Sequence, residues 1–211
     1  MSDLLPVLMG ITLLYLAVAG MVGAYIRVLV LQGILLFGFA LNNISGLNIT
    51  AFLFAAVETL LFKAILIPWF LNKTVKENGI KREIEPDIST FYSLFAVSVI
   101  FILGFTLAFG STHFTSGVNP VAFGVSFSMI MTGLLLIVTR KKLITHIMGY
   151  MVMENGIFLL SLSLAREMPV IVALGISLDI FIGVLLAGVF ISRIKSTFDD
   201  QDVDNLSTLR D

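Results

Sequence analysis

The sequence predicts an all-α, polytopic membrane protein with seven transmembrane helices, the N-terminus outside and the C-terminus inside the cell. Three features carry this prediction. Of the 211 residues, 58% are hydrophobic and 13% are charged, whereas a soluble domain has about 25% charged residues. The apolar residues form long runs, and the Lys and Arg residues gather between alternate runs. This composition excludes an ordinary soluble enzyme and a basic nucleic-acid-binding domain.

Seven stretches approach the length of about 20 mostly apolar residues that a helix needs to cross a hydrocarbon core about 30 Å thick. They are residues 4–25, 28–40, 49–71, 91–110, 120–139, 143–165 and 169–192. The second is short and starts almost directly after the first, which places Arg27 in a tight turn. The first follows no basic leader and is too long for a signal peptide, so it is expected to be retained. Trp69, next to Pro68, is expected to anchor the third span at the inner interface.

The orientation follows from the distribution of basic residues, because Lys and Arg concentrate in cytoplasmic loops. With the N-terminus outside, 11 of the 13 Lys and Arg residues fall on the inner face, and only Arg166 falls on the outer face. The inner set is Arg27, Lys73, Lys76, Lys81, Arg82, Arg140, Lys141, Lys142, Arg193, Lys195 and Arg210. Residues 1–193 are therefore expected to form one transmembrane domain, and residues 194–211 a cytoplasmic tail.

Four charged residues interrupt the apolar spans: Glu58, Lys63, Glu154 and Asp179. A charge in hydrocarbon costs about 2.5–3.5 kcal/mol on insertion scales, so such residues persist where they face protein or water and have a partner. The three acids fall near the middle of their spans. On an α-helix Lys63 lies about 7.5 Å nearer the inner face than Glu58 and is turned from it by about 140°. Lys63 is expected to stay inside the bundle and pair with a carboxylate, and the four residues indicate a polar layer that carries protons.

The sixth span carries a row of polar residues at four-residue spacing: Lys142, His146, Tyr150 and Glu154. The row drifts by about 40° per step but stays on one side of a helix, from the inner surface to the midplane. Histidine changes charge near neutral pH, tyrosine both donates and accepts hydrogen bonds, and a carboxyl can hold a proton. With the neighbouring Asn155, these residues are candidates for proton transfer.

Structural roles are an open alternative for these residues. Glu58 and Lys63 could neutralise charges on neighbouring helices. His146 and Tyr150 lie near the membrane interface, where amphipathic rings are common.

An internal repeat is indicated by residues 31–36 (LQGILL) and 154–159 (ENGIFL). An amide in each copy precedes an acid in the next span: Gln32 precedes Glu58, and Asn155 precedes Asp179. Two parallel three-helix repeats, about residues 4–71 and 120–192, would then be joined by the fourth span.

Residues 148–156 (MGYMVMENG) and 175–179 (GISLD) resemble component E of hydrogenase-4, a membrane subunit of the group 4 nickel–iron hydrogenase and formate hydrogenlyase type. Residues 63–68 (KAILIP) and the tail 202–210 (DVDNLSTLR) fit the same family. The C-terminal third also resembles subunit K of respiratory complex I and the C component of multisubunit Na⁺/H⁺ antiporters. Asp179 matches a carboxylate of those proteins, whereas their other carboxylate falls on Met151, one turn from Glu154. That shift favours the hydrogenase family.

The resemblance implies a supporting role in a prokaryotic cytoplasmic membrane. Such complexes couple electron flow in a soluble arm to H⁺ or Na⁺ movement through antiporter-like membrane subunits. This chain is expected to be a non-redox subunit of the membrane arm that catalyses no reaction alone. Because it has no cysteine and only two histidines, no cofactor is expected in it, and the nickel–iron centre and iron–sulfur clusters are expected on partner chains. The expected partners are antiporter-like and other membrane subunits, the soluble hydrogenase arm and lipid, with no nucleic acid.

Three alternatives differ in mechanism. The chain could be a structural linker that anchors antiporter-like subunits without conducting protons, or a subunit of a multisubunit Na⁺/H⁺ antiporter. A self-standing transporter fits less well, since no span is visibly interrupted and no substrate-sized polar cavity is indicated.

Overall fold

The computed structural model describes residues 3–43, 49–77, 88–111 and 119–164, where the regular structure is helical. The elements are α1 (Leu4–Val18), α2 (Val22–Asn43), α3 (Ile49–Ala55), the π-helix η1 (Ala56–Leu66), α4 (Ile67–Glu77), α5 (Thr90–Ser111), α6 (Pro120–Thr139) and α7 (Leu143–Leu164). α3, η1 and α4 follow one another without a break and form one continuous rod. The all-helical prediction is confirmed.

Four of the described helices are long and apolar enough to cross a membrane: Val22–Asn42, Thr90–Gly110, Pro120–Thr139 and Leu143–Leu164. α1 is apolar but shorter. The last predicted span, residues 169–192, lies outside the described residues together with Asp179. Seven spans therefore stay a prediction.

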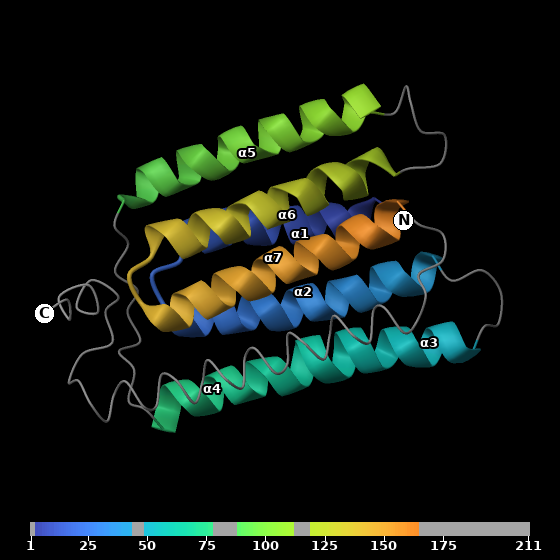
Figure 1. Cartoon of the computed structure of the whole chain (residues 1–211), viewed down its shortest axis with the longest axis horizontal. Coiled ribbons are helices and arrows are strands. Elements are labelled where there is room, and N and C mark those ends of the chain that lie inside the picture. Colours follow the sequence, from blue (N-terminus) through green and yellow to red (C-terminus); the bar gives the residue numbers. More distant parts are fainter. Residues whose placement is uncertain (1–2, 44–48, 78–87, 112–118, 165–211) are drawn as a thin grey trace, which may run out of the picture.

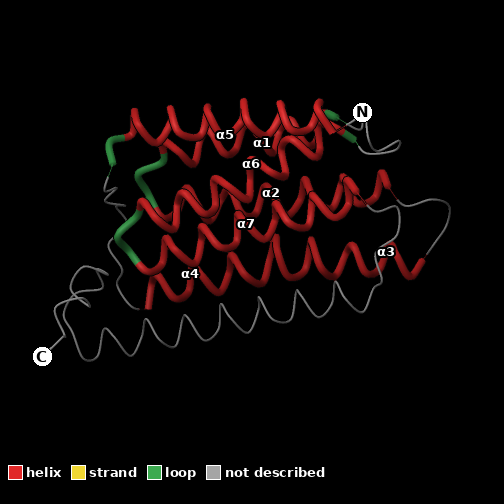
Figure 2. The backbone as a smooth tube through the Cα atoms, turned by 45° about the horizontal axis from the view of Figure 1, so that its top comes forward, coloured by secondary structure: helices red, strands yellow, loops and turns green. Residues whose placement is uncertain are grey.

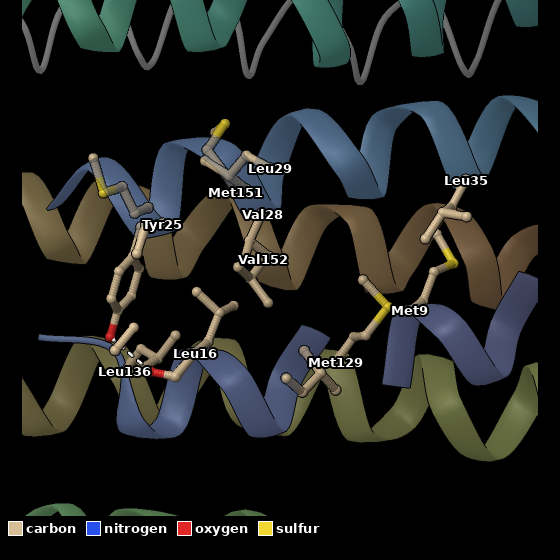
Figure 3. Close-up of a cluster of buried hydrophobic side chains, with 14 of the residues drawn as sticks. Met9, Leu16, Tyr25, Val28, Leu29, Leu35, Met129, Leu136, Met151 and Val152 are labelled. Carbon is tan, nitrogen blue, oxygen red and sulfur yellow. Dashed lines mark hydrogen bonds between the residues drawn. The ribbon is translucent and has the colours of Figure 1, made fainter. Parts of the chain in front are cut away.

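The helices lie side by side in one bundle (Figure 1). α5 forms one edge, where it packs on α1 and α6, and the rod of α3, η1 and α4 forms the opposite edge, where it packs on α2 (Figure 2). The apolar core lies between these edges, where Met9 and Leu16 of α1 meet residues of α2, α6 and α7, such as Leu35, Met129 and Val152 (Figure 3). A polar group placed in this interior has no water available, so its partners must come from neighbouring helices.

The first connection differs from the prediction, because Arg27 is not in a turn. α1 ends at Val18, Ala19 is extended (φ −68°, ψ 123°), and α2 already begins at Val22, so Arg27 lies inside α2. Two distant side chains bind the last carbonyls of α1: the Tyr25 hydroxyl donates to Leu16 O at 3.2 Å (Figure 3), and Arg140 donates to Ala17 O at 3.3 Å. The Ala19 N–H also donates to Leu16 O, and the two side chains supply further donors at a helix end, where carbonyls lack intrahelical partners.

The basic residues of the described part gather at one end of the bundle, with the exception of Lys63. Arg27 lies near the start of α2, Lys73 and Lys76 lie near the end of α4, and residues 140–142 connect α6 to α7. Figure 1 shows that the turn between α1 and α2, the end of α4 and the turn between α6 and α7 share one side of the molecule. The opposite end holds Asp3 and Asn119, which are joined by a 2.9 Å hydrogen bond.

Candidate functional site

Lys63 and Glu154 form a buried ion pair between two elements that are far apart in sequence. Lys63 Nζ, from η1, lies 2.5 Å from Glu154 Oε1, from α7, and each side chain is only 5% exposed. The prediction that Lys63 stays inside the bundle and pairs with a carboxylate is confirmed. At this distance and burial the two charges attract each other strongly, because little solvent screens them.

Small residues beside the pair let the helices approach closely. A Cβ added to Gly33 of α2 would lie 2.9 Å from the backbone nitrogen of Ala64, the residue after Lys63. A Cβ added to Gly156, two residues after Glu154, would lie 2.9 Å from Ile130 N of α6. Side chains at these two glycines would force η1 from α2 and α7 from α6, so the glycines help to place both charges.

The π-helical geometry of η1 changes the expected relation between Glu58 and Lys63. On an α-helix they would point about 140° apart. η1 has i→i+5 hydrogen bonds, which bring residues five apart close to one helical turn from each other. Both side chains are accordingly buried, with Glu58 1% and Lys63 5% exposed. From this position the Lys63 side chain reaches across to Glu154 of α7.

Asn155 begins a chain of buried hydrogen bonds from α7 through α2 to α1. Asn155 Nδ2 donates to Gln32 Oε1 at 3.1 Å, and Gln32 Nε2 donates to Thr12 Oγ1 at 2.8 Å. The Thr12 hydroxyl in turn donates to Met9 O at 2.6 Å. The sequence did not single out Gln32 or Thr12 as site residues, although the repeat had matched Gln32 to Asn155. The structure thus joins two amides that the sequence pattern matched to each other, and one of them, Asn155, is next to Glu154 in the chain.

The polar row on α7 does not form one continuous buried line. His146 is half-buried, and its Nε2 lies 2.5 Å from the carbonyl oxygen of Arg140. Tyr150 is 41% exposed, whereas Glu154 is 4% exposed. The drift of about 40° per four residues is enough to separate these environments over three turns. His146 therefore belongs to the basic end of the bundle, and Tyr150 lies on a more exposed side of α7 than the Lys63–Glu154 pair.

Met151 has an apolar environment. It is 3% exposed and belongs to the core drawn in Figure 3, while Glu154 is directed to η1. The shift of one turn from Met151 to Glu154 thus changes the neighbour of the side chain from the apolar core to Lys63 of η1.

The ion pair brings together a carboxyl and an amine, two groups whose charges a neutral amide could not replace. Among the described residues, no three His, Cys, Asp or Glu side chains cluster as metal ligands would.

Comparisons with known proteins agree with a membrane-complex subunit. A family model described as NADH-ubiquinone/plastoquinone oxidoreductase chain 4L matches residues 121–211, which include most of α6 and all of α7. An uncharacterized protein of Mycobacterium tuberculosis is 29% identical over 189 residues, which are 89% of this chain and 86% of that protein. Hydrogenase-4 component E of Escherichia coli K12 and that of Shigella flexneri are each 29% identical over 169 residues, covering 75% of this chain and 76% of theirs. No solved structure matches the chain.

Proposed function

We propose that this homologue of hydrogenase-4 component E is a membrane-arm subunit of a complex I-like nickel–iron hydrogenase or formate hydrogenlyase. Its intramembrane charges take part in H⁺ or Na⁺ movement coupled to electron transfer on partner chains. Similarity to two membrane-complex families supports the first statement. The buried Lys63–Glu154 pair carries the second, because such pairs are expensive in a membrane and are typical of ion pathways.

The pair supplies a way to couple two helices to one proton. While Glu154 is ionised, its attraction holds Lys63, and with it η1, against α7. A proton that enters from water neutralises Glu154 and removes this attraction, so the ammonium can shift away from the carboxyl. Asp179, which the sequence places near the same depth in the next span, is our candidate for a second proton carrier.

The remaining parts of the proposal concern the setting of the subunit. We place it in a prokaryotic cytoplasmic membrane with seven spans and the basic end facing the cytoplasm, as the clustering of Arg27, Lys73 and Lys76 supports. Antiporter-like subunits and a soluble hydrogenase arm are its partners, and those chains carry the metal centres.

A purely structural role is the second candidate. The hydrogen-bond chain of Asn155, Gln32 and Thr12 ties α7 to α2 and α1, as a linker subunit would require. In that case the Lys63–Glu154 pair would only pin η1 to α7.

The substitutions Glu154→Gln and Asp179→Asn separate the two candidates, because an amide preserves size and hydrogen bonding but cannot exchange a proton as a carboxyl does. We expect both variants to assemble, Glu154→Gln with a lower yield because Lys63 loses its partner, and the assembled complexes to keep hydrogen turnover with artificial electron carriers. Ion movement per hydrogen turned over, measured in membrane vesicles, should fall by about tenfold or more, as for loss of a proton-transferring group.

The matched control is Glu77→Gln, which removes a carboxylate that is 63% exposed and lies outside the layer. It should leave coupling intact. Normal coupling in both Glu154→Gln and Asp179→Asn would favour the linker role.

A further inference from the structure

The Lys63 ammonium touches two side chains of α7 at once. Besides its contact with Glu154, Nζ lies 4.2 Å from the centroid of the Phe158 ring. Glu154 and Phe158 are four residues apart, so they lie on one face of α7 on successive turns. Phe158 is 7% exposed, and the contact is therefore shielded from water like the ion pair beside it.

The two contacts respond differently to a proton. The carboxylate loses its charge when it is protonated, and with it most of its attraction for the ammonium. The face of an aromatic ring attracts a cation within about 6 Å through its quadrupole, and it has no proton to gain or lose. The attraction of the ring is therefore the same in both states of Glu154.

We propose that Phe158 is a positioning residue: while Glu154 carries a proton, the face of the Phe158 ring gives the Lys63 ammonium a second binding position that has no charge of its own. This inference rests on the proposed function. A hydronium ion gives a proton to the Glu154 carboxylate, so that one O–H bond forms on the carboxyl, one breaks in the hydronium ion and water is left, and the ammonium shifts from the carboxyl towards the ring face. Lys63 thereby stays charged and stays beside α7, ready to pair again when Glu154 releases its proton.

The test compares an aliphatic and an aromatic replacement in the assembled complex in membrane vesicles. Phe158→Leu removes the ring face but keeps an apolar side chain, and Phe158→Tyr keeps the ring. A desolvated cation–π contact is worth roughly a factor of 30 in an equilibrium, so we expect Phe158→Leu to lower ion movement per hydrogen at least about fivefold. Phe158→Tyr should stay within about twofold of the parent, and hydrogen turnover with artificial carriers should be unchanged in both.

Phe101→Leu serves as the matched control. Phe101 lies on α5, where it stacks with Phe105 at 6.3 Å between ring centroids, and it packs against the apolar core. Its replacement removes an aromatic side chain without touching Lys63 and should leave coupling unchanged. If it lowers coupling as much as Phe158→Leu does, loss of any packed ring explains the effect and the proposal is wrong.

Three further outcomes overturn the proposal. One is normal coupling in Phe158→Leu, and another is equal loss of coupling in Phe158→Leu and Phe158→Tyr. The third is failure of both Phe158→Leu and the more flexible Phe158→Met to assemble while Phe158→Tyr assembles, which would assign the ring to packing. Glu154→Gln separates this inference from the proposed function. Normal coupling in Glu154→Gln contradicts the function itself, whereas loss there with normal coupling in Phe158→Leu contradicts only the role of the ring.

Discussion

Lys63 and Glu154 stabilise this fold only as a pair, because either charge alone would be buried without a partner. Both side chains are 5% exposed, and a buried charge that loses its partner costs several kcal/mol, whereas removal of both charges is often nearly neutral. Removal of one of the two charges should therefore destabilise the bundle more than removal of both.

This gives a prediction for stability. Lys63→Met should lower the free energy of unfolding by about 3–5 kcal/mol, because it leaves the Glu154 carboxylate buried without its cation. The double variant Lys63→Met with Glu154→Leu should recover most of that loss. Thermal denaturation of the purified complex in detergent measures both.

Lys73→Met is the control, because the Lys73–Glu77 pair spans 3.7 Å and its side chains are 51% and 63% exposed. No measurable change is expected for such a surface pair. A double variant less stable than Lys63→Met would contradict the argument.

For single residues, the sequence predicted which charged side chains are buried, but it did not predict which side chains they contact. Lys63 and Glu154 stood out because charged residues in apolar spans are costly, and this argument needs no structure. Their pairing depends on how η1 and α7 approach, which glycines such as Gly33 and Gly156 control through contacts far apart in sequence. The contact of Phe158 with Lys63 could not be predicted for the same reason, since a Phe in an apolar helix does not differ from its neighbours in the sequence.

Among the helices, the contact of α6 with α7 depends on two facing glycines. A Cβ on Gly133 would lie 2.6 Å from Gly149 O, and a Cβ on Gly149 would lie 2.9 Å from Gly133 O. Real Cβ atoms do not approach backbone oxygens so closely, so any side chain there must separate the helices. Because α7 carries Glu154, a shift of α7 would also disturb the ion pair.

Gly133→Ala should therefore reduce the yield of assembled complex and lower its melting temperature, with a destabilisation of about 1–3 kcal/mol as for an overpacked core. Gly23→Ala is the matched control, since nothing lies within 4 Å of a Cβ at Gly23 in α2. Alanine favours a helix over glycine, so this control should be neutral or slightly stabilising. Equal behaviour of the two variants would show that α6 and α7 tolerate separation.

Helix existence was easier to predict than helix ends. Hydropathy located the apolar stretches, but it did not predict the break between α1 and α2 at residues 19–21, because the residues on both sides of the break are apolar. That break is stabilised by Tyr25 and by Arg140, which comes more than a hundred residues later. The π-helical geometry of η1, in which Glu58 and Lys63 are both buried, likewise leaves no mark in the spacing of apolar residues.

For the molecule as a whole, the basic residues of the described part other than Lys63 group at one end of the bundle. The turn between α1 and α2, the turn between α6 and α7 and the end of α4 all lie at this end. The positive-inside rule assigns such an end to the cytoplasm.

A reporter that is active only in the cytoplasm should therefore work when it is fused after Asp211, and it should be silent when inserted near residue 116, in the predicted outer connection. A reporter that is active only outside the cytoplasmic membrane should give the reverse pattern. Activity of the second reporter after Asp211 would refute the combination of an outside N-terminus with an odd number of spans.

The distance along the chain between Lys63 and Glu154 also bears on how the protein is made. The two residues are separated by 91 positions, and synthesis at about 5–20 residues per second covers that distance in roughly 5–20 s. If residues 49–71 span the membrane as the sequence predicts, this segment enters the bilayer with Lys63 before Glu154 has been made. Release of the nascent chain from the insertion machinery should therefore wait for α7, and a product truncated before α7 carries an unmatched intramembrane charge of the kind that membrane quality control removes.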